Sequence, residues 1–200
     1  MGTSVRKMYD AELLQLDTML ARMGHAAGGA IESAMTALRT GDTELARSVI
    51  ARDSEIDSAE HEIEHRCLTL FLRQQPVAGD LRKVSTALKM VTDIERIGDH
   101  ASDIAEIIPH LVTVRKEGDP AVSQAIAMGR KAYQMIQDAM AALAAEDELA
   151  ARKVIAADDA VDFDFNAIKH TLAQEIAANP AKVDAALDLL ICLLYTSDAA

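Results

Sequence analysis

Apolar side chains recur every three or four residues through most of the chain, the spacing that places them on one face of an α-helix. In the first half they define three stretches, residues 9–39, 43–73 and 81–108. Thr-Gly-Asp at 40–42 and Pro-Val-Ala-Gly at 76–79 interrupt the pattern with residues that favour turns. The pattern therefore predicts three antiparallel helices joined by short turns.

Two features inside these stretches bear on their geometry. Gly28 and Gly29 lie within the first helix, where each costs about 1 kcal/mol relative to alanine, so we expect a close helix contact or a bend there. Pro109 has no backbone N–H to continue a helix, and we expect it to end the third helix at Ile108.

The second half of the chain repeats the first at a constant offset of 105 residues. Repeated identity in one register predicts two copies of one three-helix unit, residues 1–112 and 113–200. The identities are Met23-Gly24 with Met128-Gly129, Ala34-Met35 with Ala139-Met140, Ala37-Leu38 with Ala142-Leu143, and Arg47, Val49, Ile50, Ala51, Asp53 and Asp57 with Arg152, Val154, Ile155, Ala156, Asp158 and Asp162.

Composition and charge narrow the fold class and the function. Half of the residues are apolar but only 3% are aromatic, which favours an all-α fold of two tandem, spectrin-repeat-like three-helix bundles packed through aliphatic side chains. The formal net charge of −12 argues against nucleic-acid binding. No apolar run is long enough to cross a membrane and no leader-like segment opens the chain, so we expect a cytoplasmic protein.

Acidic residues replace apolar ones midway along two of the predicted helices. Asp53 and Asp57 are four residues apart on the second helix, and Glu95 and Asp99 are four apart on the third. Each pair therefore shares one helical face, and the two helices are antiparallel neighbours. Asp103 continues the stripe on the third helix.

These carboxylates allow two interpretations. Clustered carboxylates repel one another, and a cation such as Mg²⁺, Ca²⁺, iron, manganese or zinc relieves that repulsion. The same spacing is also typical of a solvated acidic face, because the apolar face of the second helix is some 70 to 80° away from the acidic one by helical count. The pattern in the first repeat leaves both interpretations open.

The segment from His61 to His65 spells H-E-x-x-H, the pattern of zinc proteases. A protease also needs a third ligand and a substrate cleft beside a strand, and no strand is predicted, so we expect both histidines to face solvent. Glu62-x-x-His65 also matches half of a ferritin-like di-iron site, but its second copy is missing. A ferritin-like carboxylate-bridged metalloenzyme and a metal-free helical adaptor therefore stand as alternatives.

The segment RQQPVAGDLRKVSTALKMVTDIERIGDHASDIAEI at 73–107, with DSEID at 53–57, resembles the PhoU family, whose members regulate phosphate uptake. The resemblance extends to about Ile191 and includes the duplication. It implies two tandem three-helix bundles. It also implies a metal-binding negative regulator of phosphate uptake and phosphate-starvation signalling, and not an enzyme.

The resemblance further implies a ligand set and partners. It implies that acidic E(D)-x-x-x-D motifs bind iron, zinc, manganese or magnesium, and that the protein forms a homo-oligomer, expected to be a dimer. The expected partners are the ATPase of the phosphate ABC transporter and a phosphate-sensing histidine kinase. Asp103 stands where the family often has asparagine, and it is held as an extra ligand. Carried over by position, the metal ligands are Asp53, Asp57, Glu95, Asp99, Asp158 and Asp162.

The repeat and the resemblance both stop before the last residue. At 194–198 the chain reads Leu-Tyr-Thr-Ser-Asp where an ERIGD-like segment belongs. We therefore expect the second bundle to be incomplete in its last helix and the fourth acidic motif to be absent. We also expect the sequence from Cys192 onward to be a truncation or a foreign read-through.

Overall fold

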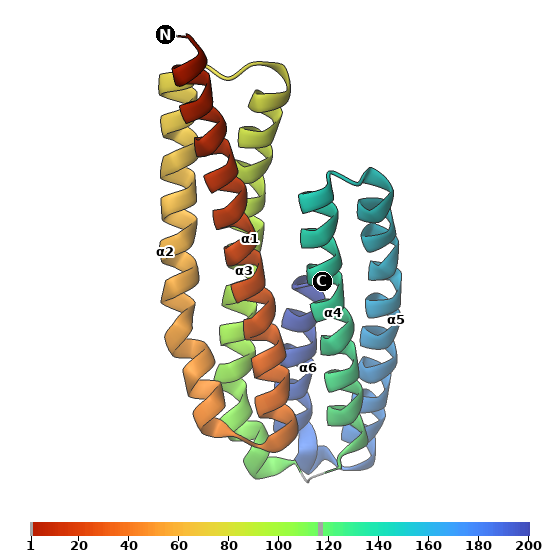
Figure 1. Cartoon of the computed structure of the whole chain (residues 1–200). Coiled ribbons are helices and arrows are strands. Elements are labelled where there is room, and N and C mark those ends of the chain that lie inside the picture. Colours follow the sequence, from red (N-terminus) through yellow and green to blue (C-terminus); the bar gives the residue numbers. More distant parts are fainter. Residues whose placement is uncertain (1, 116–117) are drawn as a thin grey trace.

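A computed structural model of the chain, which describes residues 2–115 and 118–200, consists of helices and short turns (Figure 1). Within those residues there is no strand, which confirms the all-α class. The elements are α1 (Gly2–Thr40), α2 (Thr43–Gln74), α3 (Ala78–Val114), α4 (Pro120–Ala145), α5 (Glu148–Ala178), a 3-10 turn (Pro180–Lys182) and α6 (Val183–Asp198).

The turn between the first two helices is built in the same way in both repeats. Asp42 caps α2 by accepting hydrogen bonds from the backbone N–H groups of its first turn, and Asp147 caps α5 in the equivalent position. The residue before each cap, Gly41 or Glu146, has a left-handed backbone with φ of 66° or 50°. Glycine takes this conformation without strain, whereas Glu146 takes it at some cost.

The sequence predicted that Pro109 would end the third helix, and this prediction is wrong. Helix α3 continues through it to Val114. The reason is packing, because Ile108 and Leu111 on either side of the proline are fully buried in the core. Burial of such side chains is worth about 1.5–3 kcal/mol each, which offsets the helix hydrogen bond that the proline cannot make.

The two bundles lie side by side, with α1 packed against α4 and α3 against α6 (Figure 1). The contact is approximately two-fold symmetric. Gly24 of α1 packs against Met140 of α4, and the equivalent Gly129 packs against Met35. A side chain on either glycine would overlap the methionine, so glycine allows the two repeats to approach closely.

The prediction of a close contact at the paired glycines of α1 is confirmed for one of them. A Cβ on Gly28 would meet the side chains of Gln137 and Ile136 on α4, at 3.0 and 3.3 Å. A Cβ on Gly29 would meet nothing within 4 Å. Gly28 therefore faces the second bundle, whereas Gly29 faces open space.

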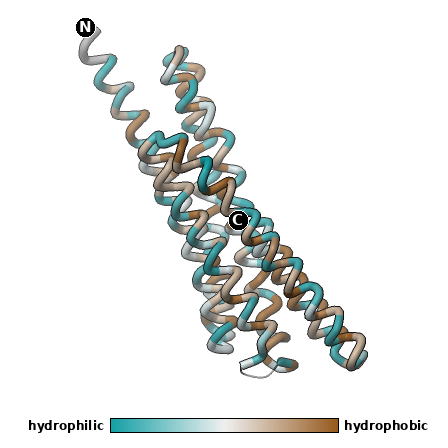
Figure 2. The backbone as a smooth tube through the Cα atoms, turned by 90° about the vertical axis from the view of Figure 1, so that its right-hand side faces the viewer, coloured by the Kyte–Doolittle hydropathy of each residue, from teal (hydrophilic) through white to brown (hydrophobic). Residues whose placement is uncertain are grey.

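Hydrophobic and hydrophilic residues alternate along every helix (Figure 2), and the buried ones form two clusters. One cluster fills the first bundle around Leu16, Ile63 and Val91. The other joins the end of the first bundle to the second, and includes Ile104 and Leu189. The core is thus continuous across the boundary between the repeats.

The second bundle is less complete than the first. Its third helix, α6, has 16 residues, whereas α3 has 37, and in Figure 1 the chain ends partway along α4 and α5. Helix α5 exposes Leu149, Ile155 and Phe163 by 72 to 74%. No helix among the described residues combines the length and apolar content needed to cross a membrane.

Candidate metal centre

Three carboxylates from two helices converge in the first bundle. Asp53 and Asp57 come from α2 and Asp99 comes from α3, and one oxygen of each lies within 4.8 Å of the others. The four-residue spacing places both α2 acids on one face, and the close packing of α2 against α3 brings Asp99 opposite them. The sequence-predicted convergence of these three residues is what the structure displays.

The cluster lies at the edge of the contact between α2 and α3. Asp53 and Asp57 are half-buried and Asp99 is exposed. Oδ1 of Asp53 is fully buried and has no hydrogen-bond partner in the described part of the chain. A buried oxygen without a partner costs free energy unless a donor or cation contacts it.

Burial and mutual repulsion perturb two of the acids. The pKa of Asp53 is raised, first by burial and then by the charges of Asp99 and Asp57, whereas the Ser102 hydroxyl acts in the opposite direction. The pKa of Glu95 is also raised, mainly by burial and then by Asp99. Both carboxylates are therefore held in surroundings that disfavour their negative charge.

Glu95 and Asp103 flank the three-residue cluster on α3. Glu95 is half-buried, and the charges of Asp57 and Asp53 contribute to its raised pKa, so it faces the same side as they do. It does not belong to the group whose oxygens lie within 4.8 Å. Burial raises the pKa of Asp103, and the charge of His100 opposes this shift. Both residues extend the acidic surface without completing the central group.

Gly98 makes the convergence of α2 and α3 possible. A Cβ on this residue would lie 2.9 Å from Cδ1 of Ile56 and 3.3 Å from Oδ1 of Asp53. Any side chain here would therefore overlap Ile56, so that either Ile56 or the helices would have to shift. Sequence reasoning did not identify Gly98 or Ser102 as supporting residues. A glycine within a helix and beside an acidic motif was the available signal for Gly98, and no pattern marked Ser102.

The structure does not bring the second-repeat pair to other ligands. Asp158 and Asp162 lie on α5 and are both exposed. In the described ranges, 2–115 and 118–200, no third histidine, cysteine or acidic residue lies close enough to form a group with them. The two carboxylates therefore remain an isolated pair on one helix.

The histidines of the protease-like motif face solvent, as predicted. His61 and His65 are exposed. Nδ1 of His61 lies 3.4 Å from Oε2 of Glu60, its neighbour in the sequence. Among the described residues they belong to no group of potential ligands. Cys67, on the same helix, is buried, which raises the pKa of its thiol to about 11 and keeps it protonated.

The donor set decides which cations fit the centre. All three converging ligand atoms are carboxylate oxygens, which suit Mg²⁺ and Mn²⁺ and are accepted by iron and zinc. The buried, unpartnered oxygen of Asp53 is the atom that such an ion would satisfy. The residues present therefore fit a cation held between α2 and α3.

Comparisons with known proteins agree with this architecture. A family model described as the PhoU domain matches residues 20–108 and 126–198. The chain is 36% identical over 191 residues to a phosphate-specific transport system accessory protein PhoU homolog from Clostridium acetobutylicum, covering 95% of this chain and 86% of the relative. It is 33% identical to the homolog so named from Aquifex aeolicus, covering 89% of this chain and 80% of that protein.

Solved structures show the same fold. The crystal structure of PhoU from Pseudomonas aeruginosa superposes with a TM-score of 0.90 at 28% identity, covering 96% of this chain and 91% of that one. The phosphate transport system regulatory protein PhoU from Streptococcus pneumoniae gives a TM-score of 0.83 at 24% identity, covering 96% and 89%.

Proposed function

This chain belongs to the PhoU family, and we propose that it is a metal-binding negative regulator of phosphate uptake and phosphate-starvation signalling. The curated relatives are named as accessory proteins of phosphate-specific transport. The family is one of regulatory accessory proteins, so the chain is not an enzyme.

The carboxylate group between α2 and α3 is the observation that carries the metal-binding proposal. Asp53, Asp57 and Asp99 would hold the ion, with Glu95 one helical turn away on α3. A bound cation supplies positive charge that removes the repulsion among these acids and satisfies the buried oxygen of Asp53. Iron, zinc, manganese and magnesium are the proposed ions.

The second repeat contributes less to this proposal. Asp158 and Asp162 offer two carboxylates on the exposed side of one helix. A chelate of two solvated carboxylates is weak, because water and salt compete for the ion. We therefore propose these residues only as ligands of a low-affinity site, distinct from the one in the first bundle.

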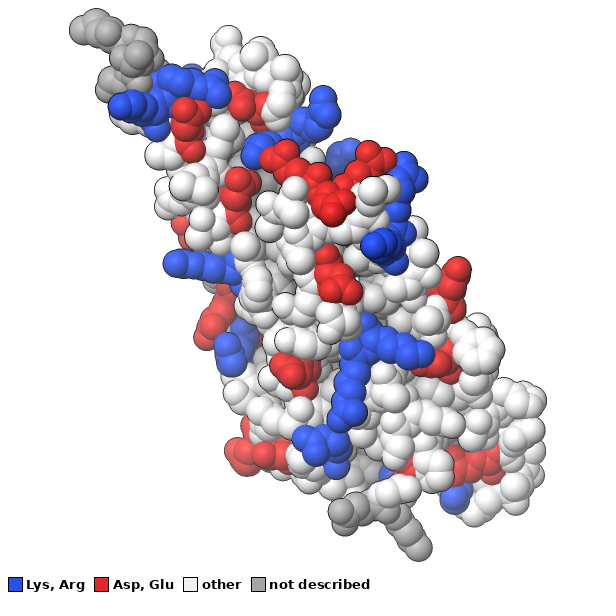
Figure 3. Space-filling model, turned by 45° about the vertical axis from the view of Figure 1, so that its right-hand side comes forward, with Lys and Arg blue, Asp and Glu red and all other residues white. Residues whose placement is uncertain are grey.

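The proposed regulation is a set of protein contacts. The protein acts in the cytoplasm as a homo-oligomer, and it contacts the ATPase of the phosphate ABC transporter and the phosphate-sensing histidine kinase. The names of the relatives support an association with phosphate transport. On the face shown in Figure 3, acidic and basic side chains are interspersed, which suits protein partners better than a nucleic acid.

Metal analysis of two matched double variants tests the proposal. Asp53→Asn/Asp99→Asn removes two carboxylates from the central group, and Asp158→Asn/Asp162→Asn removes the two exposed ones. We expect purified wild type and the second variant to retain bound metal after gel filtration, and the first variant to lose it. The first variant should also fail to repress a phosphate-starvation reporter in cells that lack the native gene.

Other outcomes would support the alternatives. If the wild type, reconstituted with each of the four ions, retains none of them, the metal-free helical adaptor is correct. Bound iron that consumes oxygen over repeated turnovers would instead support the ferritin-like metalloenzyme.

A further inference from the structure

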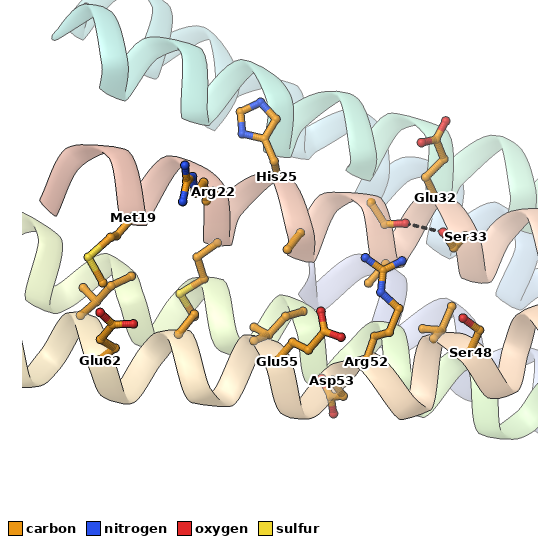
Figure 4. A pocket seen from close by; sticks show the side chains of 18 of the residues that line it. Met19, Arg22, His25, Glu32, Ser33, Ser48, Arg52, Asp53, Glu55 and Glu62 are labelled. Carbon is orange, nitrogen blue, oxygen red and sulfur yellow. Dashed lines mark hydrogen bonds between the residues drawn. The ribbon is translucent and has the colours of Figure 1, made fainter. Parts of the chain in front are cut away.

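A surface groove of about 500 Å³ lies between α1 and α2, and its lining includes Asp53 of the acidic cluster (Figure 4). Its floor is apolar and includes the buried side chains of Met23, Val49 and Ile63. Its α1 wall includes the small residues Ala26, Gly29 and Ala30, and a Cβ on Gly29 would meet nothing within 4 Å. The chain itself leaves this apolar hollow unfilled.

The groove is lined by six acidic or basic side chains. Four exposed ones alternate in sign around it, and two further acids, Asp53 and Glu55, lie between Arg52 and Glu62 in the sequence. Arg22 and Glu32 lie ten residues apart on α1, and Arg52 and Glu62 lie ten apart on α2. Ten residues span about 15 Å of helix. Because the helices are antiparallel, Arg22 lies toward the same end as Glu62, and Glu32 toward the same end as Arg52 (Figure 4). Each end of the groove therefore has one positive and one negative side.

These charges are available for a partner. In the parts of the chain that the structure describes, Arg22, Glu32 and Arg52 form no ion pair within 4.0 Å, and Glu62 reaches only Arg66, at 3.8 Å. Such charges on a helix surface contribute little to the stability of a single copy. Three of the four charges therefore have no partner of opposite sign within the described part of the chain.

The internal repeat shows that the fold does not require these charges. A second groove, of about 360 Å³, lies between α4 and α5 and is lined by equivalent positions such as Val154 and Lys153. Gln134 occupies the position equivalent to Gly29, so the second groove lacks the small residue that leaves the first groove open. The four positions equivalent to the charged residues are neutral: Ala127, Gln137, Ala157 and Ala167.

We propose that the α1–α2 groove is the face through which two copies of this chain associate. The inference rests on the homo-oligomer proposed above and names its surface. A two-fold axis in the plane of this face, running along the groove, places Arg22 of one copy over Glu62 of the other. An axis running across the groove places it over Glu32 instead. In both cases every arginine meets a glutamate.

The middle of the groove is compatible with the same pairing. By the antiparallel register of α1 and α2, His25 and Glu55 on its lining lie opposite Gly29 or Ala59 of the second copy in either orientation. No like charges are brought together at the centre. The pattern of four charges that alternate in sign is thus complementary to the same pattern on another copy. A second copy of this chain is the partner that the pattern fits.

Filling the hollow tests the proposal without disturbing a single copy. Gly29→Leu adds a side chain into open space and replaces a poor helix former, so we expect thermal stability to be kept or raised. We expect the dimer seen by sedimentation at micromolar concentration to become a monomer. Gln134→Leu, at the equivalent position of the second repeat, should leave the dimer intact.

Charge reversal then distinguishes the two orientations. Arg22→Glu replaces two attractions by two repulsions in the symmetric pair, and we expect it to raise the dimer dissociation constant by about tenfold at low salt. Arg22→Glu/Glu62→Arg restores association if the axis runs along the groove. Arg22→Glu/Glu32→Arg restores it if the axis runs across. One of the two double variants should therefore recover and the other should weaken further.

Three results would overturn the inference. If neither Gly29→Leu nor Arg22→Glu changes the dimer, the two copies associate through another face. The proposed surface is then wrong, whereas the proposed homo-oligomer is correct. Two double variants that both remain as weak as Arg22→Glu exclude the self-complementary pairing. A wild type that stays monomeric at every concentration excludes both this surface and the proposed oligomer, while the metal analysis above is unaffected.

Discussion

At the scale of single residues, the fold holds a carboxylate of the acidic centre in surroundings that disfavour its negative charge. Asp53 is held against α3 by Gly98, its Oδ1 is buried without a partner, and its pKa is raised by burial and by neighbouring charges. A carboxyl group whose pKa is higher in the folded state than in the unfolded state stabilises the fold when protonated. That contribution is present at low pH and is lost as the pH rises through the folded-state pKa.

Asp53→Asn tests this in metal-free protein. The variant does not titrate, so its stability relative to wild type should increase as the pH rises from about 4 to 7. The expected gain is roughly 0.5 kcal/mol, a small figure because the group is partly solvated. Urea unfolding at several pH values, in the presence of a chelator, measures the difference. An Asp53→Asn curve parallel to wild type would contradict the prediction.

The sequence predicted which acids share a helical face but not how buried that face is. A four-residue spacing places Asp53 and Asp57 together, whatever α2 packs against. Whether the face is solvated depends on how closely α3 approaches, and that distance is set by Gly98 and Ile56 on different helices. Periodicity is a property of one helix, so the contact between the two helices was outside its reach.

At the scale of elements, the clearest error of the sequence reasoning is the end of α3. Proline was expected to stop the helix, but tertiary packing extended it to Val114. The extension brings Arg115 to the junction of the two repeats, where its side chain is only 5% exposed. Its guanidinium donates hydrogen bonds to Asp119, to Glu175 and to the carbonyl oxygen of Ala185. One side chain thus ties α3 to the start of α4, the end of α5 and the start of α6.

Replacing Arg115 should loosen this junction. Arg115→Met keeps the length of the side chain but leaves the carbonyl of Ala185 and part of two acids without their donor, so we expect a loss of roughly 2 kcal/mol in unfolding free energy. Urea unfolding measures the loss. Arg152→Met removes an exposed pair with Glu148 and should change stability by less than about 0.5 kcal/mol. Equal effects of the two substitutions would show that Arg115 does not join the helices.

At the scale of the whole molecule, duplication was read correctly from the sequence, but the inequality of the two repeats is a packing property. Helix α2 buries six side chains and α5 buries three, although they are equivalent and nearly equal in length. The difference follows from the short α6, which covers less of its bundle than α3 covers of the first. Each buried aliphatic side chain is worth about 1.5–3 kcal/mol, so the second repeat has much less to hold its middle helix.

Local stability should therefore differ between the repeats, and hydrogen exchange can measure it. Amides in residues 149–163 of α5 should exchange at least about tenfold faster than those in the equivalent residues 44–58 of α2, because less buried surface opposes local opening. Phe163→Ser serves as a control, since this side chain is 73% exposed and its loss should not accelerate exchange in α5. Val161→Ala, at a fully buried position, should accelerate it. Equal protection of α2 and α5 would mean that a surface absent from a single copy covers α5, and the exposed apolar residues Leu149, Ile155 and Phe163 would then mark where that cover lies.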